Sequence, residues 1–291
     1  MKDLTISPMS AADLDTVIDW AAQEGWNPGL HDASAFHAAD PAGFLLARYA
    51  GEPVASISAV RYGEDFGFIG LYIVKPMYRG QGFGWATWQA GMAHLSGRII
   101  GLDGVIAQQE NYQKSGFTLH HRNIRFEGRA QPTSGLTPPA TTAAPTDKRI
   151  VPLSELDFEL LTAYDQAFFP AGRAVFLAHW IKQINGYSLA LMHHNTLSGY
   201  GVIRPCRSGY KIGPLFAQTE QDAEQLLVSL SASISADAAI YLDVPECNPA
   251  AMRLAQHHAM QPMFETARMY TGTAPEMALE RTFGISTFEL G

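Results

Sequence analysis

Residues 71–88, LYIVKPMYRGQGFGWATW, constrain the fold more than any other part of the sequence. An apolar strand ends at a proline, a loop with glycines at positions 80, 82 and 84 follows, and the residues after it lack strand alternation and predict a helix. Glycines let consecutive backbone N–H groups approach an anion closely, and the positive end of the helix dipole adds to the attraction. With Arg79 at its start, this loop is typical of a phosphate-binding turn.

A Rossmann dinucleotide site is the main alternative for this loop, because Asp103 lies about twenty residues further on, where a ribose-binding carboxylate would sit. However, the G-x-G-x-x-G spacing requires a glycine at position 85, which is Trp85. The strands expected before the loop, at 44–49, 54–61 and 66–74, are joined by the turns AGEP and YGED and predict an antiparallel meander. A βαβ unit would not begin in this way.

The rest of the chain indicates a duplication. Residues 1–127 predict the element order ααβββαβαβ, a mixed and mainly antiparallel sheet flanked by helices. Residues 128–148 are rich in Pro, Thr, Ala and Ser and predict a linker. Residues 149–291 repeat the same order, and GLDGV at 101–105 matches YLDV at 241–244. We therefore expect one α+β fold present twice.

Two patterns carry a family resemblance. Arg79, Gly82 and Gly84 form R-x-x-G-x-G, and residues 111–117, NYQKSGF, contain Y-x-x-x-G-F after one further strand and helix. Both resemble motifs of the GNAT N-acetyltransferases, and the chain is similar to a tandem member with a degenerate second half. The resemblance implies acetyl-CoA as the co-substrate, without a metal ion. It implies coenzyme A contacts at Tyr72, Ile73, Val74, Arg79, Gly80, Gln81, Gly82, Phe83, Gly84, Trp85 and Asn111.

The resemblance also implies direct attack of an amine on the thioester. Tyr112 would protonate the leaving thiolate, and the N–H groups of residues 72–74 would pair with pantetheine and polarise the thioester carbonyl. The glutamate that many relatives carry on this strand is absent, since residues 70–72 read Gly-Leu-Tyr. Asp103 is our candidate general base, with a water chain or Glu64 as alternatives.

The resemblance places the acceptor site under the loop at 24–32, EGWNPGLHD, so Trp26 and Asn27 are candidate substrate contacts, with packing as the alternative role of the tryptophan. In the second half the corresponding loop at 217–224, AQTEQDAE, has no arginine or glycine and three acidic residues. We expect this half to close the acceptor pocket or to form a homodimer surface rather than to bind acetyl-CoA.

Composition narrows the partners and the location. The formal net charge of -8 disfavours nucleic acid and suits a small-molecule amine. The N-terminus lacks an apolar signal region, and no apolar run approaches the roughly 20 residues of a membrane helix, so we expect a cytoplasmic protein without a membrane partner.

Other reactive residues fit simpler roles. Cys206 lies between Arg204 and Arg207, yet no motif supplies a histidine base, so an inert cysteine is the favoured interpretation. The histidine pairs at 120/121, 193/194 and 257/258 lack a spaced third ligand for a metal ion. A coenzyme A sensor without turnover is the other functional class, because no general base is identified from the residues.

Overall fold

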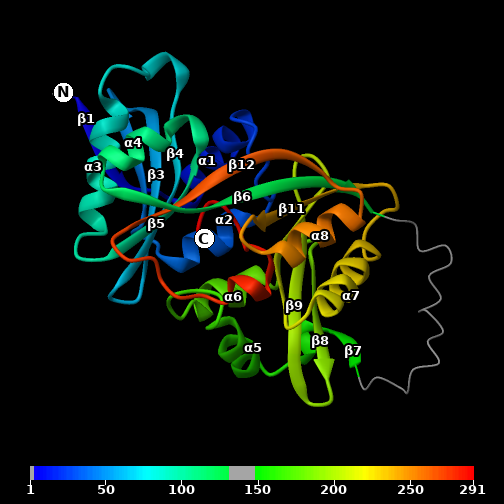
Figure 1. Ribbon diagram of the computed structural model, residues 1–291. Coiled ribbons are helices and arrows are strands. Elements are labelled where there is room, and N and C mark those ends of the chain that lie inside the picture. The colour runs from blue at the N-terminus through cyan, green and yellow to red at the C-terminus, as the bar shows by residue number, and fades with distance from the viewer. Residues whose placement is uncertain (1–2, 131–147) are drawn as a thin grey trace.

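The computed structural model describes residues 3–130 and 148–291, and the two halves follow the same order of elements (Figure 1). The first half contains β1 (Leu4–Pro8), α1 (Ala11–Gln23), α2 (Asp32–Ala39), β2 (Phe44–Tyr49), β3 (Glu52–Tyr62), β4 (Phe66–Val74), α3 (Phe83–His94), β5 (Ile99–Val105), α4 (Gln109–Lys114) and β6 (Phe117–Arg129). The second half contains β7 (Lys148–Pro152), α5 (Phe158–Asp165), α6 (Ala174–Trp180), β8 (Tyr187–His193), β9 (Thr196–Pro205), β10 (Tyr210–Ala217), α7 (Glu220–Ser231), β11 (Ala239–Pro245), α8 (Pro249–His257), β12 (Gln261–Thr271) and β13 (Thr282–Gly284).

The expected order lacks the strands β1, β7 and β13. The strands β1 and β7 each span five residues at one end of the sheet, with side chains exposed or half-buried, and β13 spans three residues beside β10. A short edge strand buries too little surface to impose the apolar alternation on which a strand prediction depends. The expected order is otherwise found in both halves, which confirms the duplicated α+β fold.

The described strands form one continuous sheet in which the halves exchange their last strands. The sheet order is β1-β2-β3-β4-β5-β12-β6-β11-β10-β9-β8-β7, with β13 beside β10. The strand β12 therefore lies between β5 and β6, and β6 lies between β12 and β11; both cross the middle of the molecule (Figure 1). Neither half has a complete sheet without a strand from the other.

The exchanged strands cross the expected domain limits, which stay a prediction. Position 127 falls inside β6, which pairs with β11 from Asn123 to Arg129. Lys148, expected at the end of the linker, is the first residue of β7. Residues 131–147, the greater part of the expected linker, lie outside the described residues. The amino-acid composition changes at residues 128–148, but β6 of the first half pairs with β11 of the second half.

The hydrophobic core follows the same plan. The helices α1, α2, α5 and α6 share one buried cluster, in which the rings of Phe36 and Trp180 stack at 6.0 Å across the two halves. A second cluster lies under α3 and α4 and includes Trp88 and Phe117, and a third packs α7 and α8 of the second half. The shared cluster joins the two halves into one folding unit.

Two buried ion pairs hold the exchanged strands. Arg268 of β12 lies directly across from Asp103 of β5, with Nε–Oδ1 and Nη2–Oδ2 distances of 2.8 and 2.6 Å. Arg125 of β6 lies directly across from Asp243 of β11, with the same two atom pairs at 2.7 and 2.8 Å. The two aspartates are those of the matching GLDGV and YLDV segments. The internal repeat therefore marks a structural ion pair in each half.

We expect Asp243→Asn to lower the free energy of unfolding by about 3–5 kcal/mol, because it leaves the buried Arg125 without its counter-charge. The double variant Asp243→Asn/Arg125→Met should lose less than the single one. Urea denaturation measures both. Glu265→Gln, which removes a partly exposed pair with Arg122, is the control and should cost about 0–1 kcal/mol. Equal losses for Asp243→Asn and Glu265→Gln would contradict the proposed role of the buried pair.

Candidate active site

A cleft opens in the sheet of the first half, where β4 and β5 separate. The two strands pair in parallel only from Phe66 opposite Ile99 to Ile69 opposite Leu102. Beyond that point lies a cavity of about 480 Å³. It is lined by Glu24, Trp26, Ile69, Gly70, Leu71, Tyr72, Ile73, Val74, Arg79, Gly80, Leu102, Asp103, Gly104, Val105, Gln108, Tyr112, Phe264, Thr266, Phe288 and Glu289.

A bulge in β4 turns its backbone toward this cavity. The register against β3 shifts between Ser56 and Ser58, and Leu71 has a positive φ of 44°. The Ser56 hydroxyl donates a 2.8 Å hydrogen bond to the Leu71 carbonyl oxygen, which fixes the bulge. Leu71 and Ile73 pack in the cluster on one face of the sheet, whereas Tyr72 packs in the cluster on the other face. The side chains of residues 71–73 therefore pack on the two faces of the sheet, and their backbone faces the cleft.

The glycine loop has the conformation expected of an anion-binding turn. Gly80 and Gly82 have positive φ angles of 74° and 86°, and Gly82 is the N-cap residue of α3. The N–H groups of the first helical residues have no acceptor within the helix. A Cβ atom on Gly84 would lie 2.8 Å from the Tyr72 hydroxyl oxygen, so glycine lets α3 approach β4.

Arg79 lies at the entrance of the cavity. Its Nε donates to the Val74 carbonyl oxygen at 2.9 Å, and its Nη2 contacts the Glu24 carboxylate at 2.5 Å. The side chain is 51% exposed, so one edge of the guanidinium remains accessible from solvent.

The expected coenzyme A residues divide into two groups. Those that line the cavity are Tyr72, Ile73, Val74, Arg79 and Gly80. The others contribute no side chain to it: Phe83 is buried in the core, the Gln81 amide donates to Met77, Trp85 is 59% exposed, and the Asn111 amide donates to Gln108. Gly82, Phe83, Gly84 and Trp85 thus present only backbone at the start of α3.

Tyr112 enters the cavity from α4. Its ring packs on Gly104, because a Cβ atom added to this glycine would lie 2.3 Å from the Tyr112 Cε2 atom. The ring centroids of Tyr112 and Trp88 are 5.7 Å apart. Burial raises the pKa of the Tyr112 hydroxyl, and the nearby Tyr72 adds to the shift. The phenol therefore keeps its proton at neutral pH and can donate it.

Asp103 also lines the cavity, but its carboxylate is occupied. Its side chain is fully buried, Oδ1 accepts from Asn123 at 2.8 Å, and both oxygens accept from Arg268. Glu64, the alternative base, lies exposed in the turn between β3 and β4 and is not among the residues that line the cavity. Asp103 therefore has a structural role. Neither Asp103 nor Glu64 has a carboxylate that is both free and in the cavity.

The two expected acceptor contacts differ. Trp26 lines the cavity, and its carbonyl oxygen accepts a 2.6 Å hydrogen bond from Arg125. Asn27 is not among the residues that line it: its side chain exchanges hydrogen bonds of 3.0 and 3.2 Å with the backbone of Ser208. Asn27 thus fixes the loop to the second half and does not face an acceptor there.

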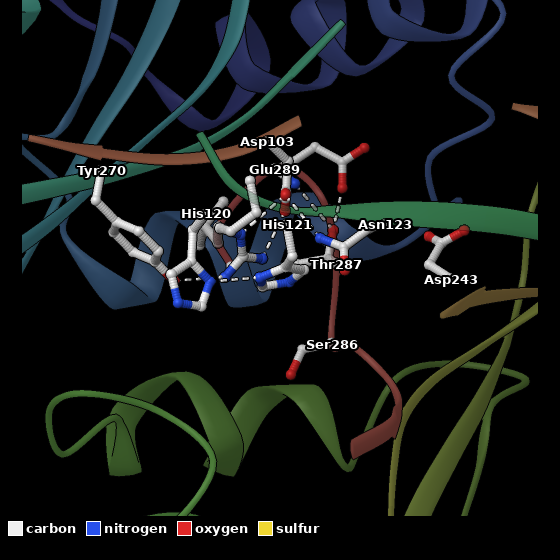
Figure 2. A network of polar contacts seen from close by, with 12 residues as sticks. Asp103, His120, His121, Asn123, Asp243, Tyr270, Ser286, Thr287 and Glu289 are labelled. Atoms are coloured by element: carbon white, nitrogen blue, oxygen red, sulfur yellow. Dashed lines mark hydrogen bonds and ion pairs between the residues drawn. The ribbon is translucent and has the colours of Figure 1, made fainter. Parts of the chain in front are cut away.

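The second half contributes residues to the cavity that were not expected from the sequence. Phe264 and Thr266 of β12, together with Phe288 and Glu289, line the same cavity. Figure 2 shows Glu289 and Thr287 in one polar network with Asp103 and Asn123. No motif marks these residues in the sequence. The second half therefore forms part of the cavity wall. That this half closes an acceptor pocket or forms a homodimer surface stays a prediction.

The equivalent cleft of the second half is filled. The strands β10 and β11 pair only from Tyr210 to Ile212, and β13 then pairs with β10 at Leu215 and Phe216. At the start of α7, the Asp222 carboxylate accepts from Lys148 and Ser198. Within the described residues, β13 thus covers the edge of β10 and the loop before α7 carries no basic residue, which agrees with a degenerate domain.

Comparisons with known proteins agree with this arrangement. The model described as "Acetyltransferase (GNAT) family" matches residues 12–117, and that described as "Acetyltransferase (GNAT) domain" matches residues 161–284. The chain belongs to the GNAT family of acyltransferases. The antiparallel meander before the loop also rules out the Rossmann alternative.

Individual relatives cover nearly the whole chain. Holothin acyltransferase of Pseudoalteromonas sp. (strain SANK 73390) is 28% identical over 287 residues, which are 99% of this chain and 94% of that protein. A candidate acetyltransferase from Pyrococcus horikoshii has a TM-score of 0.81 at 20% identity, covering 100% of this chain and 97% of its own. A tandem GNAT protein from the clavulanic acid biosynthesis pathway has a TM-score of 0.63 at 13% identity, covering 93% and 99%. Within the described residues, no helix has the length and apolar character needed to cross a membrane.

The raised pKa of Tyr112 makes stability depend on alkaline pH. The unfolded chain releases this proton near the ordinary tyrosine pKa of about 10, whereas the folded protein retains it. The free energy of unfolding should therefore fall as pH rises from about 9 to about 11. In the Tyr112→Phe variant, the free energy of unfolding should fall less steeply over the same range. Urea denaturation at both pH values measures the difference. Parallel curves for the variant and the unmodified protein would show that Tyr112 titrates normally.

Proposed function

We propose that this protein is an acetyl-CoA-dependent N-acetyltransferase for a small amine, with the reaction carried out in the first half. The observation that carries the proposal is the cleft between β4 and β5, which places an unpaired strand edge, the glycine loop and Tyr112 around one cavity.

The residues around the cleft fit an acyl-CoA. Among the residues that the structure describes, none pairs as a strand with the backbone of β4 beyond Ile69 on the β5 side, so this backbone can pair with the amide groups of a pantetheine arm as an added strand would. The N-terminus of α3 and the accessible edge of Arg79 suit the phosphates. The thioester supplies an activated acyl group when it is bound.

The protein then needs to polarise the thioester carbonyl and to protonate the leaving sulfur. Backbone N–H groups at the bulge of β4 are suited to the first task, because the bulge fixes them in place beside the cavity. The neutral Tyr112 hydroxyl is suited to the second. Holding both reactants in one cavity removes much of the entropic cost of their encounter.

The acceptor side of the cavity favours a small aromatic amine. Trp26, Phe264 and Phe288 provide flat apolar walls, and acidic side chains line the same space. The cavity volume of about 480 Å³ suits a small molecule rather than a protein chain. The name of the similar holothin acyltransferase makes holothin the first acceptor to assay, followed by benzylamine and aniline.

We expect calorimetry to give one acetyl-CoA site per chain, because among the described residues the first half has the open cleft and β13 fills the equivalent gap of the second half. Arg79→Ala should weaken acetyl-CoA binding by about 10- to 100-fold, because a hydrogen bond to a charged group contributes about 1.5–3 kcal/mol. Arg253→Ala, a change on the exposed surface of α8, is the control and should bind normally. A second site, or no binding of acetyl-CoA, would contradict the proposal; NADP should not bind.

We expect Tyr112→Phe to lower kcat by about 10² to 10⁴ while the affinity for acetyl-CoA stays unchanged, because the hydroxyl acts on the leaving group. Thiol release with the acceptor panel measures kcat, and calorimetry measures affinity. A coenzyme A sensor, the alternative class, would show no turnover in the unmodified protein. Unchanged kcat in the variant would remove Tyr112 from the mechanism.

A further inference from the structure

Three carboxylates line the cavity, and two of them are already paired. Glu24 contacts Arg79, and Asp103 forms the ion pair with Arg268. Glu289 is the third. A proton acceptor needs a carboxylate oxygen that is free to meet the substrate nitrogen.

Glu289 meets this requirement. The residue is 2% exposed, and its Oε2 accepts a hydrogen bond from the Thr287 hydroxyl. Its Oε1 is buried and has no hydrogen-bond partner within the described residues. Buried carboxylate oxygens are rarely left without a donor in a native protein, and exceptions call for a functional explanation. An amine in the cavity would supply the missing donor.

The segment at 285–291 is held firmly in place. The Glu289 carbonyl oxygen accepts from the Ser58 hydroxyl at 3.4 Å, and the Leu290 carbonyl oxygen accepts from Tyr62 at 3.2 Å. A Cβ atom on Gly70 would lie 2.1 Å from the Glu289 carbonyl oxygen. The segment therefore rests on Gly70, the position of β4 that carries no side chain. Glu289 and Gly70 line the same cavity.

Charged groups from three neighbouring strands surround Glu289. Burial lowers the pKa of Lys211 on β10, and the nearby carboxylates of Asp243 and Glu289 oppose that shift. Glu289 also contributes to the raised pKa of Arg125 on β6. Asp103 of β5 lines the same cavity. Two cations and one further carboxylate therefore lie near the Glu289 side chain.

We propose that Glu289 is the general base for the acceptor amine, an inference that rests on the proposed function. The N–H bond of the ammonium breaks, and its proton passes to Oε1 of Glu289. The nitrogen lone pair forms the C–N bond as the C–S bond breaks, and Tyr112 gives its proton to the sulfur. The nitrogen loses a second proton, which restores Tyr112 through water, and Glu289 releases its proton to solvent. The second half thus supplies a catalytic residue to the first.

The test compares Glu289→Gln with Glu265→Gln, a matched change of a carboxylate on β12 that pairs with Arg122 and is not among the cavity-lining residues. The acceptors are benzylamine, which is protonated at neutral pH, and aniline, which is neutral. Glu289→Gln should lower kcat with benzylamine by about 10² to 10⁴ and change kcat with aniline much less. The control should retain both rates, and calorimetry should give all proteins the same affinity for acetyl-CoA.

The pH dependence separates a base from a merely structural residue. With benzylamine, kcat of the unmodified protein should fall toward acid pH, and this acid limb should be absent in Glu289→Gln. Glu289→Asp, which keeps a titratable group, should retain the limb at a reduced rate and serves as the test if the glutamine variant does not fold. An unchanged rate and acid limb in Glu289→Gln, or equal losses for both amines, would overturn the inference. Failure of the unmodified protein to bind acetyl-CoA would instead overturn the proposed function.

Discussion

The reciprocal exchange of β6 and β12 is the constraint on which the rest of the structure depends. Each exchanged strand is fixed by a bidentate ion pair between directly opposed residues, Arg268 with Asp103 and Arg125 with Asp243. A buried charge is tolerated only when its partner is well placed, so each pair also fixes the strand register. The duplicated chain therefore forms one sheet and one shared core rather than two independent domains.

The exchange has unequal consequences for the two clefts. In the second half, β13 pairs with β10 and closes the gap between β10 and β11. The chain then continues to the first half, where residues 285–291 rest on Gly70. One segment thus fills the degenerate cleft and forms a wall of the open one. Loss of a ligand site in one repeat and completion of the site in the other follow from the same path of the chain.

The carboxylates of the first cleft show how burial and pairing assign different roles to the same chemical group. Asp103 neutralises a buried guanidinium, Glu24 holds Arg79, and Glu289 has one oxygen without a hydrogen-bond partner in the described part of the chain. Asp103 was the expected general base because it is predicted at the end of a strand facing the cleft. Its match with Asp243 in the repeat indicates the structural role instead, since a residue kept by both halves cannot serve a cleft that only one half has.

The sequence alone determined the local parts of the site. The glycine loop, the start of α3 and the position of Tyr112 depend on backbone conformations and helix signals within a few residues, so residues 71–88 and 111–117 were sufficient to predict them. Only the tertiary structure decided the partners of Asp103, the direction of Asn27 and the presence of Glu289. These depend on contacts such as Asn27 with Ser208, 181 residues apart, and Ser58 with Glu289, 231 residues apart. Local propensity carries no information on such pairs, because strand exchange is decided by which buried surfaces and charges fit once the chain has folded.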